Sequence, residues 1–133
     1  MCWILHGALK GGVDPAALEA INKKHVCHLS AGTKHDVKTA VLSCNGAFRL
    51  TDGCCDCESD VGRHDPDAAQ VRDLAALIAE AGALPGAESV SLCKAWDTQR
   101  NKRECVLKLS ELDLRQLFAD FEPGTLYTIS CQT

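Results

Sequence analysis

The chain lacks several features that define large groups of proteins. Aromatic residues make up only 5% of it, and there is a single methionine. It contains no Gly-x-Gly-x-x-Gly, no glycine-rich loop ending in Gly-Lys-Ser and no Gly-x-Ser-x-Gly, so nothing supports nucleotide-dependent chemistry or serine hydrolysis. A basic surplus is also missing, because the formal net charge is −4. With neither clustered positive charge nor stacking aromatic residues, we do not expect nucleic-acid binding.

A long hydrophobic run is missing as well. The apolar segment Cys2 to Leu9 is too short to cross a bilayer, and no positively charged segment precedes it as in a secretory signal. We expect this segment to be a strand covered on both faces, which would bury His6. The sequence therefore predicts a cytoplasmic protein without membrane contact.

The remaining composition is that of an ordinary folded domain. Hydrophobic residues make up 46% and charged residues 24% of 133 residues, and no low-complexity tract interrupts them. A chain of this length can bury about two-thirds of the surface that its unfolded form exposes. We therefore expect one α+β domain over residues 1–133.

Helix starts and stops are the clearest local signals. Asp14-Pro15 provides an N-cap and a proline for the first helical position, which predicts a helix over about 15–25. Asp65-Pro66 repeats the signature, and the apolar stripe that follows predicts a helix stopping at Gly82. Ser110 with Asp113 resembles a capping box and predicts a third helix to about Phe121.

Strands are predicted between these helices. Asn-Gly and a polar tip each favour a hairpin, because such residues accept the backbone angles of tight turns. The predicted strands are Cys2–Leu9, a short one at Val26–Leu29, a hairpin of Val37–Cys44 and Ala47–Thr51, a second hairpin of Ser89–Trp96 and Arg103–Leu109, and Leu126–Ser130.

Together these elements predict a single mixed β-sheet of about five to six strands with three helices packed on it. The order of the first six elements matches a split β-α-β arrangement of the ferredoxin-like kind, with an added helix-strand unit. A fold of this class does not define a function.

Nine cysteines and five histidines are the unusual part of the composition. Three thiols fall within four residues, Cys54-Cys55-Asp56-Cys57. In a reducing cytosol, dense cysteine more often indicates metal or redox chemistry than disulfides. In an exported protein, a disulfide framework would be the leading interpretation.

The spacing of these thiols favours a metal site. Cys54 and Cys57 form a Cys-x-x-Cys pair, which can grip one tetrahedral ion at metal–sulfur distances of about 2.3 Å, and Cys55 adds a third soft ligand. No second Cys-x-x-Cys follows, so we expect His64 or His35 to complete the shell. Such a mixed site favours zinc, whereas an all-thiolate site would suit copper(I) or an iron–sulfur cluster.

A thiol enzyme is the first alternative, with Cys55 or Cys57 as the nucleophile of a redox or transfer reaction. Negative charge around a thiol disfavours the thiolate, and this loop carries four acidic residues: Asp52, Asp56, Glu58 and Asp60. A bound cation would offset that field, so the charges favour metal binding.

An interaction domain without enzymatic activity is the second alternative. In it the cysteines are inert, and an open sheet edge recruits a protein partner or a second copy of the chain. Other cysteines, including Cys93 and Cys105, are expected to fill core space. His25, at the end of the first predicted helix, is expected to cap helix carbonyls.

Overall fold

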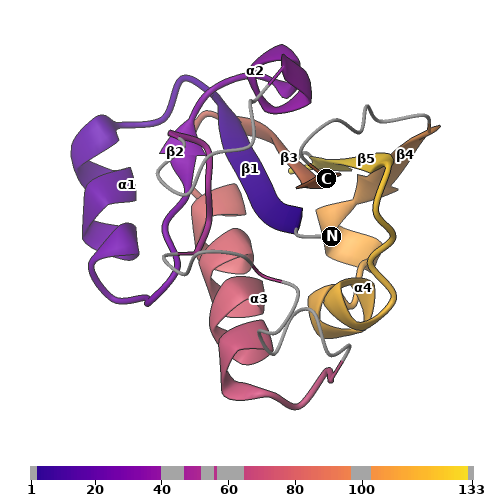
Figure 1. Cartoon of the computed structure of the whole chain (residues 1–133). Coiled ribbons are helices and arrows are strands. Elements are labelled where there is room, and N and C mark those ends of the chain that lie inside the picture. Colours follow the sequence, from indigo (N-terminus) through magenta and orange to yellow (C-terminus); the bar gives the residue numbers. More distant parts are fainter. Residues whose placement is uncertain (1–2, 40–46, 52–55, 57–64, 97–102, 132–133) are drawn as a thin grey trace.

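A five-stranded mixed sheet lies at the centre of the structure, a computed structural model that describes residues 3–39, 47–51, 56, 65–96 and 103–131 (Figure 1). The strand order is β2-β1-β3-β5-β4. The strands are β1 (Trp3–Gly11), β2 (Ser30–Ala31), β3 (Ala87–Trp96), β4 (Arg103–Lys108) and β5 (Thr125–Ser130). The helices are α1 (Pro15–Asn22), α2 (Lys34–Thr39), α3 (Ala69–Gly82) and α4 (Leu114–Ala119), and a 3-10 turn, η1 (Leu109–Glu111), precedes α4. The predicted α+β class is therefore confirmed.

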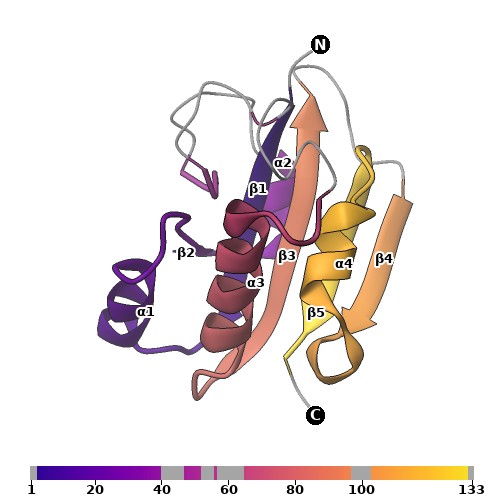
Figure 2. The same cartoon turned by 90° about the horizontal axis from the view of Figure 1, so that it is seen from below.

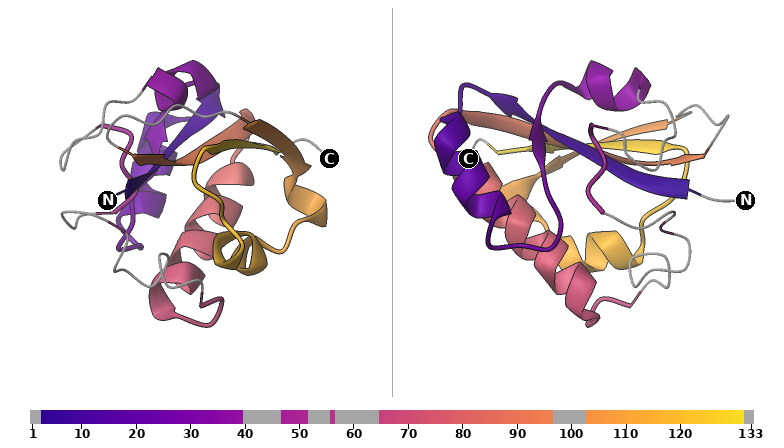
Figure 3. Two further views of the ribbon diagram at one scale, coloured as in Figure 1. Left: turned by 45° about the vertical axis from the view of Figure 1, so that its right-hand side comes forward. Right: turned by 60° about the vertical axis from the view of Figure 1, so that its left-hand side comes forward.

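The helices cover the two faces of the sheet unequally. α1, α3 and α4 lie on one face, here called the three-helix face, and α2 lies alone on the other, here called the α2 face (Figure 3). Because side chains alternate along a strand, Leu5 and Leu9 of β1 enter the main core, whereas Ala8 packs toward α2. The main core is completed by buried residues of α3 such as Leu74 and Leu77.

Local signals explain where the helices begin. The Asp14 carboxylate accepts a hydrogen bond from the Ala16 amide at 3.0 Å, and Pro15 opens α1 as predicted. α1 ends at Asn22, earlier than expected. In α4 the cap is Asp113, whose carboxylate accepts from the amides of the first turn. Ser110 lies in η1 instead, so its predicted capping role is wrong.

The predicted end of α3 at Gly82 is confirmed, but the helix begins later than predicted. The Asp65 carboxylate accepts a hydrogen bond from the Asp67 amide at 2.9 Å, and the backbone carbonyl of Asp65 accepts one from the Ala68 amide. The Asp65-Pro66 pair therefore forms a separate turn, and the helix starts at Ala69. Asx turns compete with helix starts for the same residue types, which is why the signature misled.

The second predicted hairpin is wrong in its pairing. β3 and β4 are both strands, as expected, but β5 lies between them, antiparallel to β3 and parallel to β4 (Figure 2). β4 and β5 are parallel because the chain crosses back through η1 and α4 before forming β5. As a result, Cys93 faces α2, whereas Cys105 packs on the main core.

The first predicted hairpin is also wrong where the structure describes it. Residues 37–39 are helical in α2, and residues 40–46 lie outside the described residues. The Asp36 carboxylate accepts from the Thr33 amide at 2.7 Å, which starts this helix, and Val37 is 1% exposed against the sheet. Burial of Val37 outweighs the strand preference of a β-branched residue. In the described part of the predicted return strand, the backbone of Arg49 forms an isolated β-bridge to His6.

The sheet is not a ferredoxin-like split arrangement. In a split unit a third strand separates the two parallel strands, whereas β1 and β2 are direct neighbours through Ala8 and Ser30. The predicted strand Val26–Leu29 is displaced to β2, two residues long.

Candidate functional site

Most of the predicted metal ligands lie outside the described residues. These are Cys54, Cys55, Cys57 and His64. His35 is described and lies in the first turn of α2, exposed to solvent. Asp56, the residue between Cys55 and Cys57, is described as well, and its position is the most informative structural fact about the cysteine-rich loop.

Asp56 is buried, and its side chain is hydrogen-bonded to the backbone of β1. It is 1% exposed, and one carboxylate oxygen accepts a hydrogen bond from the Leu5 amide at 2.8 Å. The other oxygen accepts from the Thr51 hydroxyl and lies 3.7 Å from the Arg49 guanidinium. The Leu5 carbonyl accepts a hydrogen bond from the Leu50 amide. The backbone of Leu5 is therefore bonded through its carbonyl to Leu50 and through its amide to the Asp56 side chain.

Arg49 and His6 flank this carboxylate. The Arg49 side chain is 3% exposed and donates to the Thr51 hydroxyl oxygen at 3.3 and 3.4 Å. His6 is fully buried, and among the described residues neither ring nitrogen has a hydrogen-bond partner. Burial lowers the pKa of His6, the nearby Arg49 charge lowers it further, and Asp56 partly opposes both. His6 is therefore a neutral imidazole at pH 7.

Lys94 is the second buried cation near Asp56. It lies on β3 and is 1% exposed, and its ammonium donates to the Phe121 carbonyl at 3.1 Å and stands 5.4 Å from the centre of the Phe121 ring. Burial lowers the pKa of Lys94 to about 8, and the Asp56 charge opposes that shift. We call His6, Arg49, Thr51, Asp56 and Lys94 the buried polar cluster.

Sequence reasoning missed this cluster because it is built from four separate segments. Asp56 was expected to be one of four charges around the thiols, and nothing local marks it as buried. Lys94 carried a usable signal, since it shares the alternation of Val90 and Leu92, which face the main core. The position of Lys94 in this alternation predicts that its side chain points toward the three-helix face.

A second polar group joins α1 to α3. The His25 ring bonds to Asp73 at 2.8 Å through one nitrogen and to Glu80 through the other, instead of capping α1 as expected. Burial lowers the pKa of His25, but the hydrogen bonds and charges of Glu80 and Asp73 outweigh burial and raise it. The second oxygen of Asp73 accepts from the Cys27 amide at 3.1 Å, so this group fixes the segment that follows α1.

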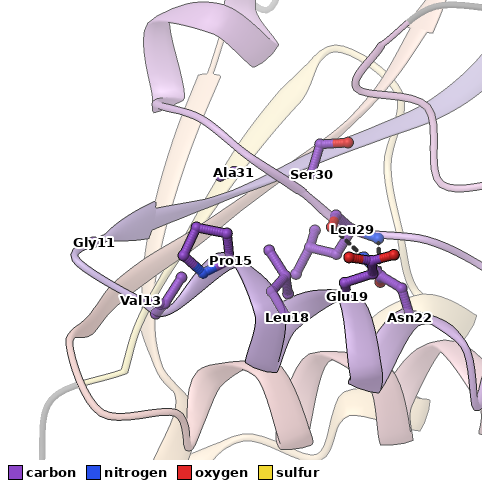
Figure 4. Close-up of a pocket in the computed structure, with 9 residues that line it drawn as sticks. All are labelled: Gly11, Val13, Pro15, Leu18, Glu19, Asn22, Leu29, Ser30 and Ala31. Atoms are coloured by element: carbon purple, nitrogen blue, oxygen red, sulfur yellow. Dashed lines mark hydrogen bonds between the residues drawn. The ribbon is translucent and has the colours of Figure 1, made fainter.

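A groove of about 290 Å³ lies between α1 and β2 (Figure 4). Its lining is mainly apolar, and Glu19 is its one charged residue: it comprises Gly11, Val13, Pro15, Leu18, Glu19, Asn22, Leu29, Ser30 and Ala31. The Asn22 amide is already used in two hydrogen bonds to the Leu29 backbone, at 2.9 Å each. Apart from Glu19, the groove therefore presents mainly apolar surface.

Within the described ranges, no group of three or more His, Cys, Asp or Glu side chains is arranged to hold a metal ion. Among the residues that the structure describes, Cys105 and Cys131 form no disulfide. In the same part of the chain no helix has the length and apolarity needed to span a membrane. Comparisons with protein-family models, curated proteins and solved structures give no match.

Proposed function

We propose that this protein binds a soft or borderline metal ion, with zinc as the leading candidate, through Cys54, Cys55 and Cys57. The observation that carries the proposal is the burial of Asp56, the residue within this cysteine group. Because Asp56 is fixed by the Leu5 amide and by Arg49, the chain is anchored between two thiol-bearing residues. Anchoring lowers the conformational entropy that a ligand must overcome when it orders a loop.

The orientation of Asp56 also suits a soft ion. Both of its carboxylate oxygens are engaged inside the protein, by the Leu5 amide and by the Thr51 hydroxyl. Asp56 is therefore not offered as a hard oxygen ligand beside the thiols. Soft thiolates favour zinc or copper(I), whereas a site rich in carboxylates favours calcium or magnesium.

The charge balance still favours a metal over a thiol enzyme, but less than the sequence implied. The Asp56 charge is offset by Arg49 at 3.7 Å, so it contributes little to the field around the thiols. Asp52, Glu58 and Asp60 remain as acidic neighbours in the sequence, and they disfavour a free thiolate. A bound cation would neutralise them. The proposal includes a reducing compartment such as the cytoplasm, where these thiols stay reduced.

A cobalt(II) titration tests the proposal, because thiolate ligands produce charge-transfer absorption that reports sulfur coordination. We expect saturation at one ion per chain and loss of the absorption in the Cys54→Ser/Cys57→Ser double variant. Cys131→Ser, which removes a half-buried thiol in the last described segment, is the matched control and should leave the spectrum unchanged.

Substitution of the histidines then identifies the remaining ligand. His35 is solvent-exposed on α2, so His35→Ala should not disturb the fold, and His64→Ala is its counterpart in the loop. One of the two should weaken cobalt binding, because the proposed site needs an imidazole as its fourth ligand. Absence of sulfur-to-cobalt absorption in the reduced protein would refute the site, and reactive thiols in that protein would favour the enzyme alternative.

A further inference from the structure

In the part of the chain that the structure describes, the outer edge of β4 is an open strand edge. β4 is the last strand of the sheet, and no described segment pairs with its outer side. The Arg103 amide donates to the Gly124 carbonyl beside β5 at 3.3 Å. Because backbone groups alternate in direction along a strand, those of Cys105 and Leu107 also point to β5, and those of Glu104, Val106 and Lys108 point outward. This edge can therefore accept another strand.

The side chains at this edge favour pairing as well. Glu104, Val106 and Lys108 share the α2 face, and Val106 is 70% exposed, so a large apolar side chain lies in water at this edge. On the opposite face, Cys105 and Leu107 are only half-buried where they pack on the main core. A strand added at this edge would therefore remove apolar surface from water on both faces of the sheet.

We propose that β4 pairs with β4 of a second copy of this chain, antiparallel and centred on Val106. Val106 then faces Val106 of the second copy, and Glu104 faces Lys108 of the second copy on each side of the two-fold axis. Opposite charges directly across an antiparallel pair stabilise it. The result is one continuous sheet through two copies, with an isologous interface.

Charge complementarity selects this register over its neighbours. A pairing centred on Cys105 would set Val106 against Glu104, and one centred on Leu107 would set Val106 against Lys108. Each of these places a charge opposite an apolar side chain and leaves part of the charge pairing unused. Lys34 of α2 contacts the Glu104 carboxylate at 2.5 Å, which orders it on the face where Lys108 of the second copy arrives.

The interface is small, since β4 has only six residues, so we expect weak association that depends on protein concentration. Sedimentation velocity over a concentration series measures it, with a reductant and a chelator present so that disulfides and metal ions cannot link the copies. Val106→Lys should abolish the dimer, because two like charges would then face each other. Val26→Lys is the matched control, because Val26 is also strongly exposed (73%), and this variant should dimerise like the unmodified chain.

Charge reversal tests the register without touching the core. Lys108→Glu and Glu104→Lys should each weaken the dimer about tenfold, because two attractive pairs per dimer become repulsive. Mixing these two variants should restore association, since each then supplies the charges that the other lacks. A protein that stays monomeric at every concentration, or a dimer that Val106→Lys leaves intact, would overturn the proposal. A mixture that associates no better than its components would overturn the register.

Discussion

Replacing Asp56 should destabilise the protein strongly, because this buried carboxylate lies 3.7 Å from the Arg49 guanidinium and its charge favours the Lys94 ammonium. In Asp56→Ala the Leu5 amide loses its acceptor, and an unsatisfied buried donor costs about 1–3 kcal/mol. The Arg49 guanidinium also loses the Asp56 carboxylate, and breaking a buried ion pair costs about 3–5 kcal/mol. The two costs overlap, so we expect a loss of about 3–5 kcal/mol in the free energy of unfolding. Asp56→Asn keeps an acceptor for Leu5 but still removes the charge beside Arg49, so its loss should lie at the lower end of that range, about 3 kcal/mol.

Urea denaturation followed by circular dichroism measures these losses, with a chelator present so that metal binding does not contribute to stability. Asp67→Asn is the matched control, because the Asp67 side chain is 74% exposed and water screens its ion pairs with Arg72 and Arg115. That variant should change stability by less than about 0.5 kcal/mol. An Asp56→Ala protein within about 1 kcal/mol of the unmodified chain would refute the buried polar cluster.

Two pH-dependent predictions follow from the other buried groups. The raised pKa of His25 means that its bonds to Asp73 and Glu80 stabilise the fold fully below about pH 6.5 and lose that effect as the pH rises through the raised value. His25→Gln should therefore cost more stability at about pH 5 than at about pH 8, and an equal cost at both would contradict the charged bridge. Lys94, with a pKa near 8 in the fold against 10.5 unfolded, should make stability rise with pH across that window, by up to about 3 kcal/mol. Lys94→Met should be at least as stable as the unmodified chain at neutral pH, and its stability should not rise between pH values near the two pKa values of Lys94. A marked loss of stability at neutral pH would show that the ammonium group stabilises the fold by more than its burial costs.

Local chemistry explains which parts of the fold could be predicted from the sequence. Asp14-Pro15 and Gly82 act through their own backbone, so the start of α1 and the end of α3 follow directly from the residues. The second hairpin failed because strand pairing is a non-local property. Nothing near Arg103 indicates that β5, formed later in the chain, will take the place beside β3.

The candidate site shows the same limit. The spacing of Cys54 and Cys57 predicts a metal site by itself, because the two ligands are close in sequence. The buried role of Asp56 could not be predicted, since it depends on Leu5, Arg49 and Lys94 from three other segments. Only the alternation of β3 suggested that Lys94 faces inward.

Elemental analysis by mass spectrometry is the most direct test of the proposed metal site. It would be applied to protein purified without a metal-affinity tag, beside the Cys54→Ser/Cys57→Ser variant and the Cys131→Ser control. We expect close to one equivalent of a soft or borderline metal in the unmodified chain and in the control, and none in the double variant. Equal metal content in all three proteins, or none in the unmodified chain, would contradict the account.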